Sequence, residues 1–307
     1  MLTNFFGKSS PINFIICGVY LLFAVFPSFF IEIPDVLTFQ EILTKGGFWL
    51  VLVFAMLLLD FIIRKNNLTG HNTFGVFIFS GLVAMLPVVF TSANIIFANV
   101  FLLLALRRMA SLTSEKNIEK KIFDASFYIT IAMLFQFWSV LFFAPLYWVI
   151  SRSNVASFRM LFIPLAGVFA VLILWVTAHL LMFDSVTWFL DWIPPLQFDF
   201  GTYNKANVLL PVAFIATLLV WTMVLRVLKF SSMPKKLQQN YRLITFVVIT
   251  SMAMLFLGPI KTGAELLFLY APLSIVATNY IERLKDILFK EMLLWAFVLL
   301  PIALLFV

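Results

Sequence analysis

The stretch LLLALRRMASLTSEKNIEKKIFDASFYI, residues 102–129, concentrates charge that is scarce elsewhere in the chain. Eight charged residues fall between Arg107 and Asp124, whereas charged residues make up only 11% of the whole sequence. An apolar run lies on each side of this segment. Because Lys and Arg are retained on the cytoplasmic side of a membrane, the stretch predicts a cytoplasmic segment between two membrane-embedded regions.

Apolar residues dominate the composition of the chain. They make up 63% of its 307 residues and give a mean hydropathy of +1.07, whereas soluble domains contain roughly 45–50% apolar residues. Apolar runs of about twenty residues, the length that spans a bilayer as a helix, recur from end to end. The sequence therefore predicts an all-α fold, a polytopic bundle of transmembrane helices that forms one integral membrane domain over residues 1–307.

The charge balance and the cysteine content narrow the function further. The net charge of +7 is expected from basic cytoplasmic loops, so membrane lipids are predicted as partners and nucleic acid is not. The single cysteine, Cys17, cannot form a disulfide within the chain, and no Cys/His cluster has metal-ligand spacing. The sequence has no phosphate-binding glycine loop, nucleophile elbow or HExxH motif. No resident metal or cofactor is predicted.

Nine apolar segments are each predicted to cross the membrane once. They are residues 11–31, 48–63, 74–90, 94–108, 157–183, 208–228, 243–259, 264–281 and 291–307. A further apolar region, residues 122–150, is 29 residues long and exceeds what one span needs. The first segment is too long for a removable signal peptide and has no small-residue cleavage site, so we expect an uncleaved first helix.

The charges of the connecting loops predict the orientation of the chain. The loop after residue 31 is net acidic and the loop after residue 108 is basic, which places the N-terminus in the cytoplasm. If residues 122–150 crossed the membrane once, the three following loops would violate this charge rule. A short re-entrant pair of helices that turns back near Gln136 restores the rule and places the C-terminus in the periplasm. One long tilted helix, giving ten spans, is the alternative.

Acidic residues gather in two loops that are predicted on the external side. The candidate catalytic residues are Glu32 and Asp35. The candidate substrate-binding residues are Asp184, Asp191, Asp199, Tyr203, Lys205, Lys261 and Glu265. Carboxylates in a mouth between helices can hold a divalent cation that binds a pyrophosphate-linked substrate, and one can act as general base on an acceptor hydroxyl. The alternative is that these residues are solvated and simply follow the charge rule.

Charged residues inside apolar spans are costly, so each is expected to have a partner. Asp60 lies one helical turn before Arg64 and is predicted to pair with it. Glu265 follows Lys261 by four residues, which is also close enough for an ion pair. His179 is expected to be a hydrogen-bonded packing residue.

Two segments are predicted to lie along the membrane surface as amphipathic helices. On the cytoplasmic side, TSEKNIEKKIF has Thr113 or Ser114 as its N-cap and either docks a partner or rests against headgroups. The candidate partner-binding residues are Glu115, Lys116, Glu119 and Lys120. On the external side, WFLDWIPPLQF holds Trp188 and Trp192 at a spacing typical of an interfacial helix.

Several stretches together carry a resemblance that covers nearly the whole chain. They are MLTNFFGKSSPINF, FLLLALRRMASL, KIFDASFYI, QFDFGTYN and GAELLFLYAPLSIVATNYIE. The sequence resembles a family of polytopic inner-membrane proteins from Bacteroidota to which no activity is assigned. The resemblance implies a multi-pass protein of the bacterial inner membrane and carries over no catalytic residue.

A more distant similarity concerns architecture. GT-C membrane glycosyltransferases use polyprenyl-phosphate sugars, place acidic residues in the first external loop and mix full spans with short helices. Glu32 and Asp35 lie in the corresponding loop here, but the loop is short and lacks the usual closely spaced acidic pair. Because this is an analogy of fold, it is weak support for function.

Three functional hypotheses follow from the sequence. The favoured one is a non-catalytic membrane subunit or scaffold of a cell-envelope complex, with envelope proteins as partners, in surface-polysaccharide assembly, secretion or gliding. The second is a GT-C-like transferase or polymerase acting on a polyprenyl-linked substrate. The third is a transporter.

Overall fold

A computed structural model of the chain describes most of its residues. The described ranges are 1–29, 38–114, 116–152, 157–184, 192–194, 199–228, 230, 235–259 and 261–306. Helices account for nearly all of this part of the chain, and it contains no β-strand. The predicted all-α fold is therefore confirmed.

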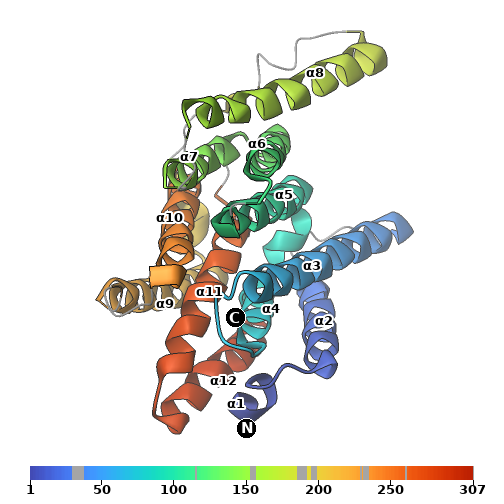
Figure 1. The fold of residues 1–307 in the computed structure, drawn as a ribbon. Helices are drawn as coiled ribbons and strands as arrows, with labels where there is room; N and C mark the ends of the chain where they lie inside the picture. The colour runs from blue at the N-terminus through green and yellow to red at the C-terminus, as the bar shows by residue number, and fades with distance from the viewer. Residues whose placement is uncertain are drawn as a thin grey trace.

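Twelve α-helices are described, and Figure 1 shows them gathered into one bundle. They are α1 (Leu2–Phe6), α2 (Pro11–Val25), α3 (Phe39–Lys65), α4 (Phe74–Met85), α5 (Ala93–Ala110), α6 (Ile118–Phe135), α7 (Phe143–Ser151), α8 (Ile163–Phe183), α9 (Ala206–Leu228), α10 (Lys235–Leu257), α11 (Leu267–Arg283) and α12 (Ile287–Leu304). Short 3-10 helices join several of them: η1 (Phe26–Phe29), η2 (Pro87–Thr91), η3 (Ser111–Ser114), η4 (Phe137–Phe142), η5 (Phe158–Leu161), η7 (Gly201–Asn204) and η9 (Ala264–Leu266).

Eight of these described helices are long and apolar enough to cross a membrane. They are α2 with η1, α3, α5 with η3, α8 with η5, α9, α10, α11 with η9, and α12. The helix α4 and the pair formed by η4 and α7 are apolar but shorter. Eight of the nine predicted spans thus contain a described helix of spanning length, whereas the predicted span 74–90 contains only the 12-residue α4 followed by η2. The described helices fit a helical membrane bundle.

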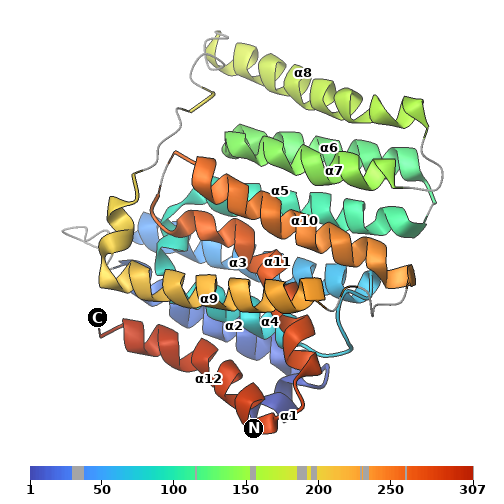
Figure 2. The same ribbon diagram turned by 90° about the vertical axis from the view of Figure 1, so that its left-hand side faces the viewer.

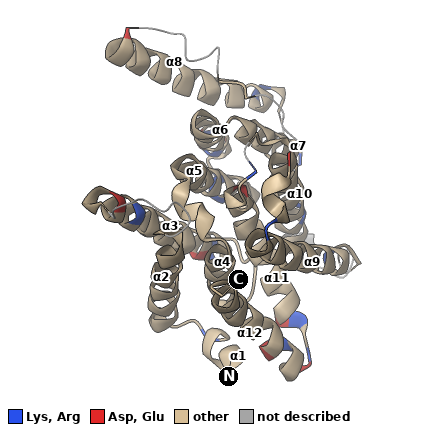
Figure 3. Ribbon diagram, turned by 180° about the vertical axis from the view of Figure 1, so that it is seen from behind, with Lys and Arg blue, Asp and Glu red and all other residues tan. Residues whose placement is uncertain are grey.

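Figure 2 shows most of the helices running side by side, so that the bundle has two ends. We call one the basic end; it is formed by residues 66–73, η3 and residues 284–286. There, the amide of Gly70 donates to Glu282 Oε1 at 2.8 Å. The other, the opposite end, is formed by η1, η7 and residues 261–263. Figure 3 shows that Lys, Arg, Asp and Glu occupy only a small part of the ribbon.

The apolar region 122–150 is divided into two helices. The helix α6 ends at Phe135, and Gln136 is extended, with φ −143° and ψ 103°. The chain then returns through η4 and α7, which lie beside α6 in Figure 2. The predicted reversal near Gln136 is thus confirmed, and the alternative of one long helix is wrong.

The first arm of this hairpin is longer than the sequence predicts. The helix α6 has 18 residues, and a helix of that length measures about 27 Å, close to the thickness of a bilayer's hydrocarbon core. At the opposite end, the indole N–H of Trp192 donates to the carbonyl of Met133 at 3.1 Å. The hairpin therefore reaches from the basic end to the opposite end instead of dipping shallowly into the bundle.

The helix α11 forms the centre of the bundle, and 94% of the most apolar 18-residue stretch within Ala264–Arg283 is buried. It packs against α4, α5, α9 and α10, which surround it in Figure 1. The helix α8 lies at the edge, packed on α6 through Gly167, where a side chain would overlap Ser126. Membrane helices approach one another closely through such small residues.

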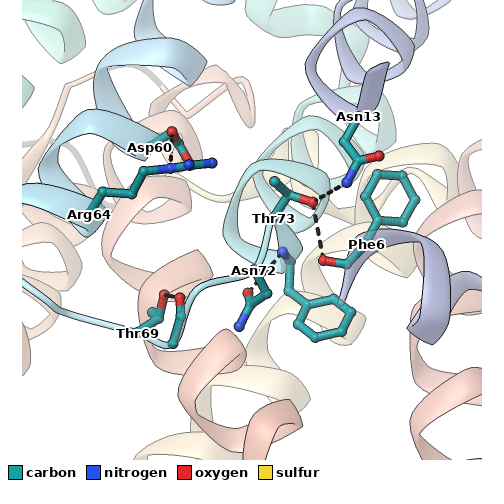
Figure 4. A network of polar contacts seen from close by, with 9 residues as sticks. Phe6, Asn13, Asp60, Arg64, Thr69, Asn72 and Thr73 are labelled. Atoms are coloured by element: carbon teal, nitrogen blue, oxygen red, sulfur yellow. Dashed lines mark hydrogen bonds and ion pairs between the residues drawn. The ribbon is translucent and has the colours of Figure 1, made fainter. Parts of the chain in front are cut away.

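Polar contacts fasten the N-terminal segment to the basic end, as Figure 4 shows. Asn13 Nδ2 donates to Thr73 Oγ1 at 2.7 Å, and Thr73 Oγ1 donates to the carbonyl of Phe6 at 3.1 Å. The predicted ion pair is also present, with Arg64 Nε 2.6 Å from Asp60 Oδ2. These contacts satisfy polar groups that lie close to the apolar interior.

The helix α3 begins earlier than its apolar run. Thr38 Oγ1 accepts from the amide of Glu41 at 3.3 Å, and Glu41 Oε2 accepts from the amide of Thr38 at 3.2 Å. This capping box starts the helix at Phe39, although the predicted span starts at residue 48. Lys45, in this added portion, is buried and donates to the carbonyl of Ser28 at 2.7 Å.

Candidate functional site

The carboxylate of Glu265 organises the opposite end of the bundle. Glu265 is 3% exposed, and its Oε1 accepts from the hydroxyl of Tyr203 at 2.7 Å. Its Oε2 accepts from the amides of Thr262 at 3.2 Å and Gly263 at 2.9 Å. Gly263 has φ +96°, a conformation that glycine adopts without strain and that shapes this turn. The carboxylate is thus held by groups of its own chain.

Lys261 is bound differently from the prediction. Its ammonium donates to the carbonyls of Leu255 and, at 3.0 Å, of Phe256 in the last turn of α10. The predicted ion pair with Glu265 is therefore wrong, because Lys261 instead satisfies carbonyls that end a helix. Its ammonium also lies 5.4 Å from the centroid of the Phe200 ring.

The surroundings of these groups shift their pKa values. Burial lowers the pKa of Lys261, and the nearby Glu265 charge opposes that shift. Burial raises the pKa of Tyr203, and the charge and hydrogen bond of Glu265 raise it further. Both shifts follow from the cost of placing a charge where water is excluded.

The structure brings together three of the candidate residues of the opposite end and leaves the others apart. Tyr203, Lys261 and Glu265 lie around the turn between α10 and α11. Three are exposed: Asp184, Asp199 and Lys205. The remaining three, Glu32, Asp35 and Asp191, lie outside the described residues. No group of His, Cys, Asp and Glu side chains within the described part of the chain is arranged to hold a metal ion.

Two individual predictions concern residues near this end. His179 packs in an aromatic row, with its ring centroid 4.7 Å from that of Phe183 and 6.3 Å from that of Trp175. Most of the predicted interfacial helix, including Trp188, lies outside the described residues. Trp192 is described and half-buried, and its ring centroid lies 5.7 Å from that of Phe137.

The predicted surface helix at the basic end is instead the first part of α6. Asn117, with φ +53°, precedes the helix and makes no side-chain cap. The hydroxyls of Thr113 and Ser114 donate backward to the carbonyls of Ala110 at 3.1 Å and Ser111 at 2.9 Å, so neither is the predicted N-cap. The candidate partner residues Lys116, Glu119 and Lys120 are exposed, and Glu115 lies outside the described residues.

A cavity of about 320 Å³, which we call the arginine cavity, lies at the basic end. It is lined by residues 67–70, Arg226, Asn240, Tyr241, Glu282 and Arg283. These come from the loop after α3 and from α9, α10 and α11, so four parts of the chain that are distant in sequence meet there.

Arg226 is the best-positioned polar group of this cavity. It is 4% exposed, its Nε donates to Thr245 Oγ1 at 3.0 Å, and its Nη2 donates to the carbonyl of Tyr241 at 2.9 Å. Its Nη1 has no hydrogen-bond partner. These two hydrogen bonds fix the guanidinium in place, and a partner for the buried Nη1 would relieve the cost of an unsatisfied donor.

The charges around Arg226 favour an anion. Arg283 lines the same cavity and adds a second positive charge. Glu282 also lines the cavity; its Oε1 accepts from the amide of Gly70 and, at 2.5 Å, from Asn72 Nδ2, and its carboxylate keeps its negative charge. Asn240 Oδ1 is buried without a partner and can accept from a ligand N–H or O–H. With Arg226 and Arg283 against Glu282, the lining carries one excess positive charge, which favours an anion.

Sequence reasoning missed this cavity. Arg226 lies within the apolar run WTMVLRVLKF, close to the end of the predicted span 208–228, where a basic residue is expected to flank a loop. Its position inside a span was the available signal, since an ionisable residue within a membrane helix marks a functional site by default. Its partners on α10 carry no such signal.

Comparison of the chain with family models, curated proteins and solved structures gives no match.

Proposed function

We propose that this protein is a subunit of the bacterial inner membrane that binds a phosphate-bearing anion in the arginine cavity. The observation that carries the proposal is the buried Arg226 guanidinium, held by Thr245 and Tyr241 with Nη1 unpaired. A planar guanidinium matches the oxygens of a phosphate group and is the usual choice for recognising them. Arg283 adds a second positive charge at the same cavity.

The proposal includes the orientation predicted from sequence, with the basic end in the cytoplasm. Among the described basic residues, only Lys45, Lys205 and Lys261 belong to the opposite end. The positive-inside rule supports this orientation, with the N-terminus in the cytoplasm and the C-terminus in the periplasm. The ligand then arrives from the cytosol or from the inner leaflet.

The binding role fits the envelope-subunit hypothesis better than the transferase hypothesis. A general base needs a carboxylate free to accept a proton from its substrate. Glu265 instead accepts from Tyr203 and two amides of its own chain. Glu32 and Asp35 remain the candidate catalytic residues of the transferase hypothesis, and that role stays a prediction. The transporter hypothesis also stays a prediction.

Ligand-dependent stabilisation of the full-length protein in mild detergent tests the proposal. A ligand that binds the folded state raises Tm, so we expect both glycerol 3-phosphate and dioctanoyl phosphatidic acid to raise it. Arg283→Gln should reduce the rise, and Lys285→Gln is the matched control, because it removes an exposed positive charge at the same end outside the cavity. If neither compound shifts Tm, or if the two variants behave alike, the proposal is wrong.

A further inference from the structure

A second hollow, of about 420 Å³, adjoins the arginine cavity. Arg226 and Tyr241 line both hollows, so this residue pair lies between them. We call the second hollow the aromatic groove; its wall includes Trp148, Phe230, Arg242, Phe246 and Ile249. Each hollow falls within the range of roughly 300–1,000 Å³ that small-molecule sites occupy.

The wall of the aromatic groove is apolar and faces the outside of the bundle. The rings of Trp148 on α7 and Phe246 on α10 meet edge to face, with centroids 6.1 Å apart. Ile249, one turn further along α10, is 54% exposed. Figure 2 shows α10 lying between α7 and α9 on the side that faces the viewer. In a bilayer this side of the bundle contacts lipid.

The groove also carries a cation where it approaches the basic end. The guanidinium carbon of Arg242 lies 4.5 Å from the centroid of the Phe230 ring. Arg226 lies at the boundary between the groove and the arginine cavity. A ligand that fills both hollows must therefore be anionic at one end and apolar at the other.

We propose that the ligand is an anionic lipid of the inner leaflet with a phosphate headgroup, an inference that rests on the proposed function. The phosphate contacts Arg226 Nη1 and Arg283 in the arginine cavity, and Arg242 balances its remaining charge. Asn240 Oδ1 accepts from a headgroup hydroxyl. The acyl or prenyl chain lies in the aromatic groove against Phe246 and Ile249. Charge complementarity and the two residues that line both hollows, Arg226 and Tyr241, are the supporting observations.

Three compounds separate a lipid from a soluble phosphate ester. Dioctanoyl phosphatidic acid has a phosphate and chains, glycerol 3-phosphate has the phosphate alone, and dioctanoylglycerol has the chains alone. The chains of phosphatidic acid pack against the groove, a contact that glycerol 3-phosphate cannot make, and its phosphate pairs with the arginines, a contact that dioctanoylglycerol cannot make. We therefore expect phosphatidic acid to bind the full-length protein at least about tenfold more tightly than either of the other two compounds. Microscale thermophoresis in mild detergent measures the three affinities.

Variants of the groove and the cavity then assign the binding energy. Phe246→Ala combined with Ile249→Ala should weaken phosphatidic acid about tenfold or more while leaving glycerol 3-phosphate unchanged. Leu209→Ala, an exposed truncation at the other end of α9, is the matched control. Arg226→Lys and Arg283→Gln should each weaken the binding of both phosphate compounds. If the variant at the buried Arg226 does not fold, the variant at the exposed Arg283 still tests the prediction.

The relative affinities of the three compounds distinguish failure of the lipid inference from failure of the proposed function. Equal affinities for phosphatidic acid and glycerol 3-phosphate overturn the lipid inference and leave the proposed function standing. Equal affinities for phosphatidic acid and dioctanoylglycerol show that the phosphate is not recognised and overturn both. Failure of both phosphate compounds to bind overturns the proposed function itself.

Discussion

The guanidinium of Arg226 lies over the ring of Tyr241, with its central carbon 3.5 Å from the ring centroid. The contact is reciprocal, because the Tyr241 hydroxyl donates to the carbonyl of Arg226 at 3.2 Å. The pair joins the basic ends of α9 and α10 and sets the direction in which Arg226 Nη1 points. A cation–π contact of this kind, when desolvated, contributes about 2 kcal/mol.

Substitutions of Tyr241 separate the two parts of this contact. Tyr241→Phe keeps the ring and loses one hydrogen bond, so we expect a loss of about 1 kcal/mol of stability and retained ligand binding. Tyr241→Leu also removes the aromatic face, so we expect a loss of about 3 kcal/mol and weakened binding. Thermal unfolding in detergent measures both, and equal effects of the two substitutions would show that the ring does not hold Arg226.

The close approach of α8 to α6 predicts a strong effect of substitution at Gly167. A Cβ atom there would lie 2.0 Å from Ser126 Oγ and 3.0 Å from the amide of Phe127. Gly167→Ala should therefore destabilise the protein by about 1–3 kcal/mol through overpacking, and Gly167→Leu by more. The measurement is the midpoint of thermal unfolding.

Gly46 provides a control for the Gly167 substitutions. It also lies in a helix, but no atom lies within 4 Å of the position where its Cβ would be. Gly46→Ala should be neutral or should stabilise by up to about 1 kcal/mol, since alanine favours a helix. If Gly46→Ala and Gly167→Ala gave the same change, α8 would not pack on α6 as described.

The hydrogen bond between Tyr203 and Glu265 predicts how stability changes at high pH. The pKa of Tyr203 is raised above its ordinary value of 10.0 in the folded state. The stabilisation by its neutral hydroxyl is fully present below about pH 10, and it is lost as the pH rises toward the folded-state pKa, because the unfolded state ionises first. Tyr203→Phe should lower Tm at neutral pH and should lose less Tm than the unmodified protein between pH 9 and pH 11. Parallel curves for the two proteins would contradict the shift.

The predicted orientation can be tested by cysteine labelling in intact cells. Lys205 and Lys116 are exposed at opposite ends of the bundle, and the natural Cys17 is buried. A membrane-impermeant maleimide should label Lys205→Cys from the periplasm, and should label Lys116→Cys only after the inner membrane is broken. The reverse pattern would place the arginine cavity outside the cytoplasm.

The helix positions and the reversal at Gln136 could be predicted because they depend on the local composition of the chain and on the charges of its loops. Apolar runs report the length of a span, and the charges of successive loops require the chain to turn back between residues 122 and 150. The early start of α3 could also have been predicted, since Thr38 and Glu41 have the spacing of a capping box. The predicted span starts only at residue 48 because residues 32–47 have the composition of a polar loop.

The polar clusters could be predicted only in part. Proximity in sequence suggested that Lys261 and Glu265 form an ion pair. In the structure, the Lys261 ammonium lies nearer to the carbonyls that end α10 than to the Glu265 carboxylate. The arginine cavity depends on α9, α10, α11 and the loop after α3 meeting at one end. No spacing along the chain contains that information, because it arises from tertiary packing.

Native mass spectrometry of the full-length protein, released from mild detergent, tests the central claim most directly. We expect the unmodified protein and Lys285→Gln to retain a phospholipid mass under collisional activation. We expect Arg283→Gln to lose most of it, because the phosphate loses one of its two arginines. Retention of the same phospholipid at the same level by Arg283→Gln, or no retained phospholipid on the unmodified protein, would contradict the assignment of the arginine cavity and the aromatic groove as a lipid-binding site.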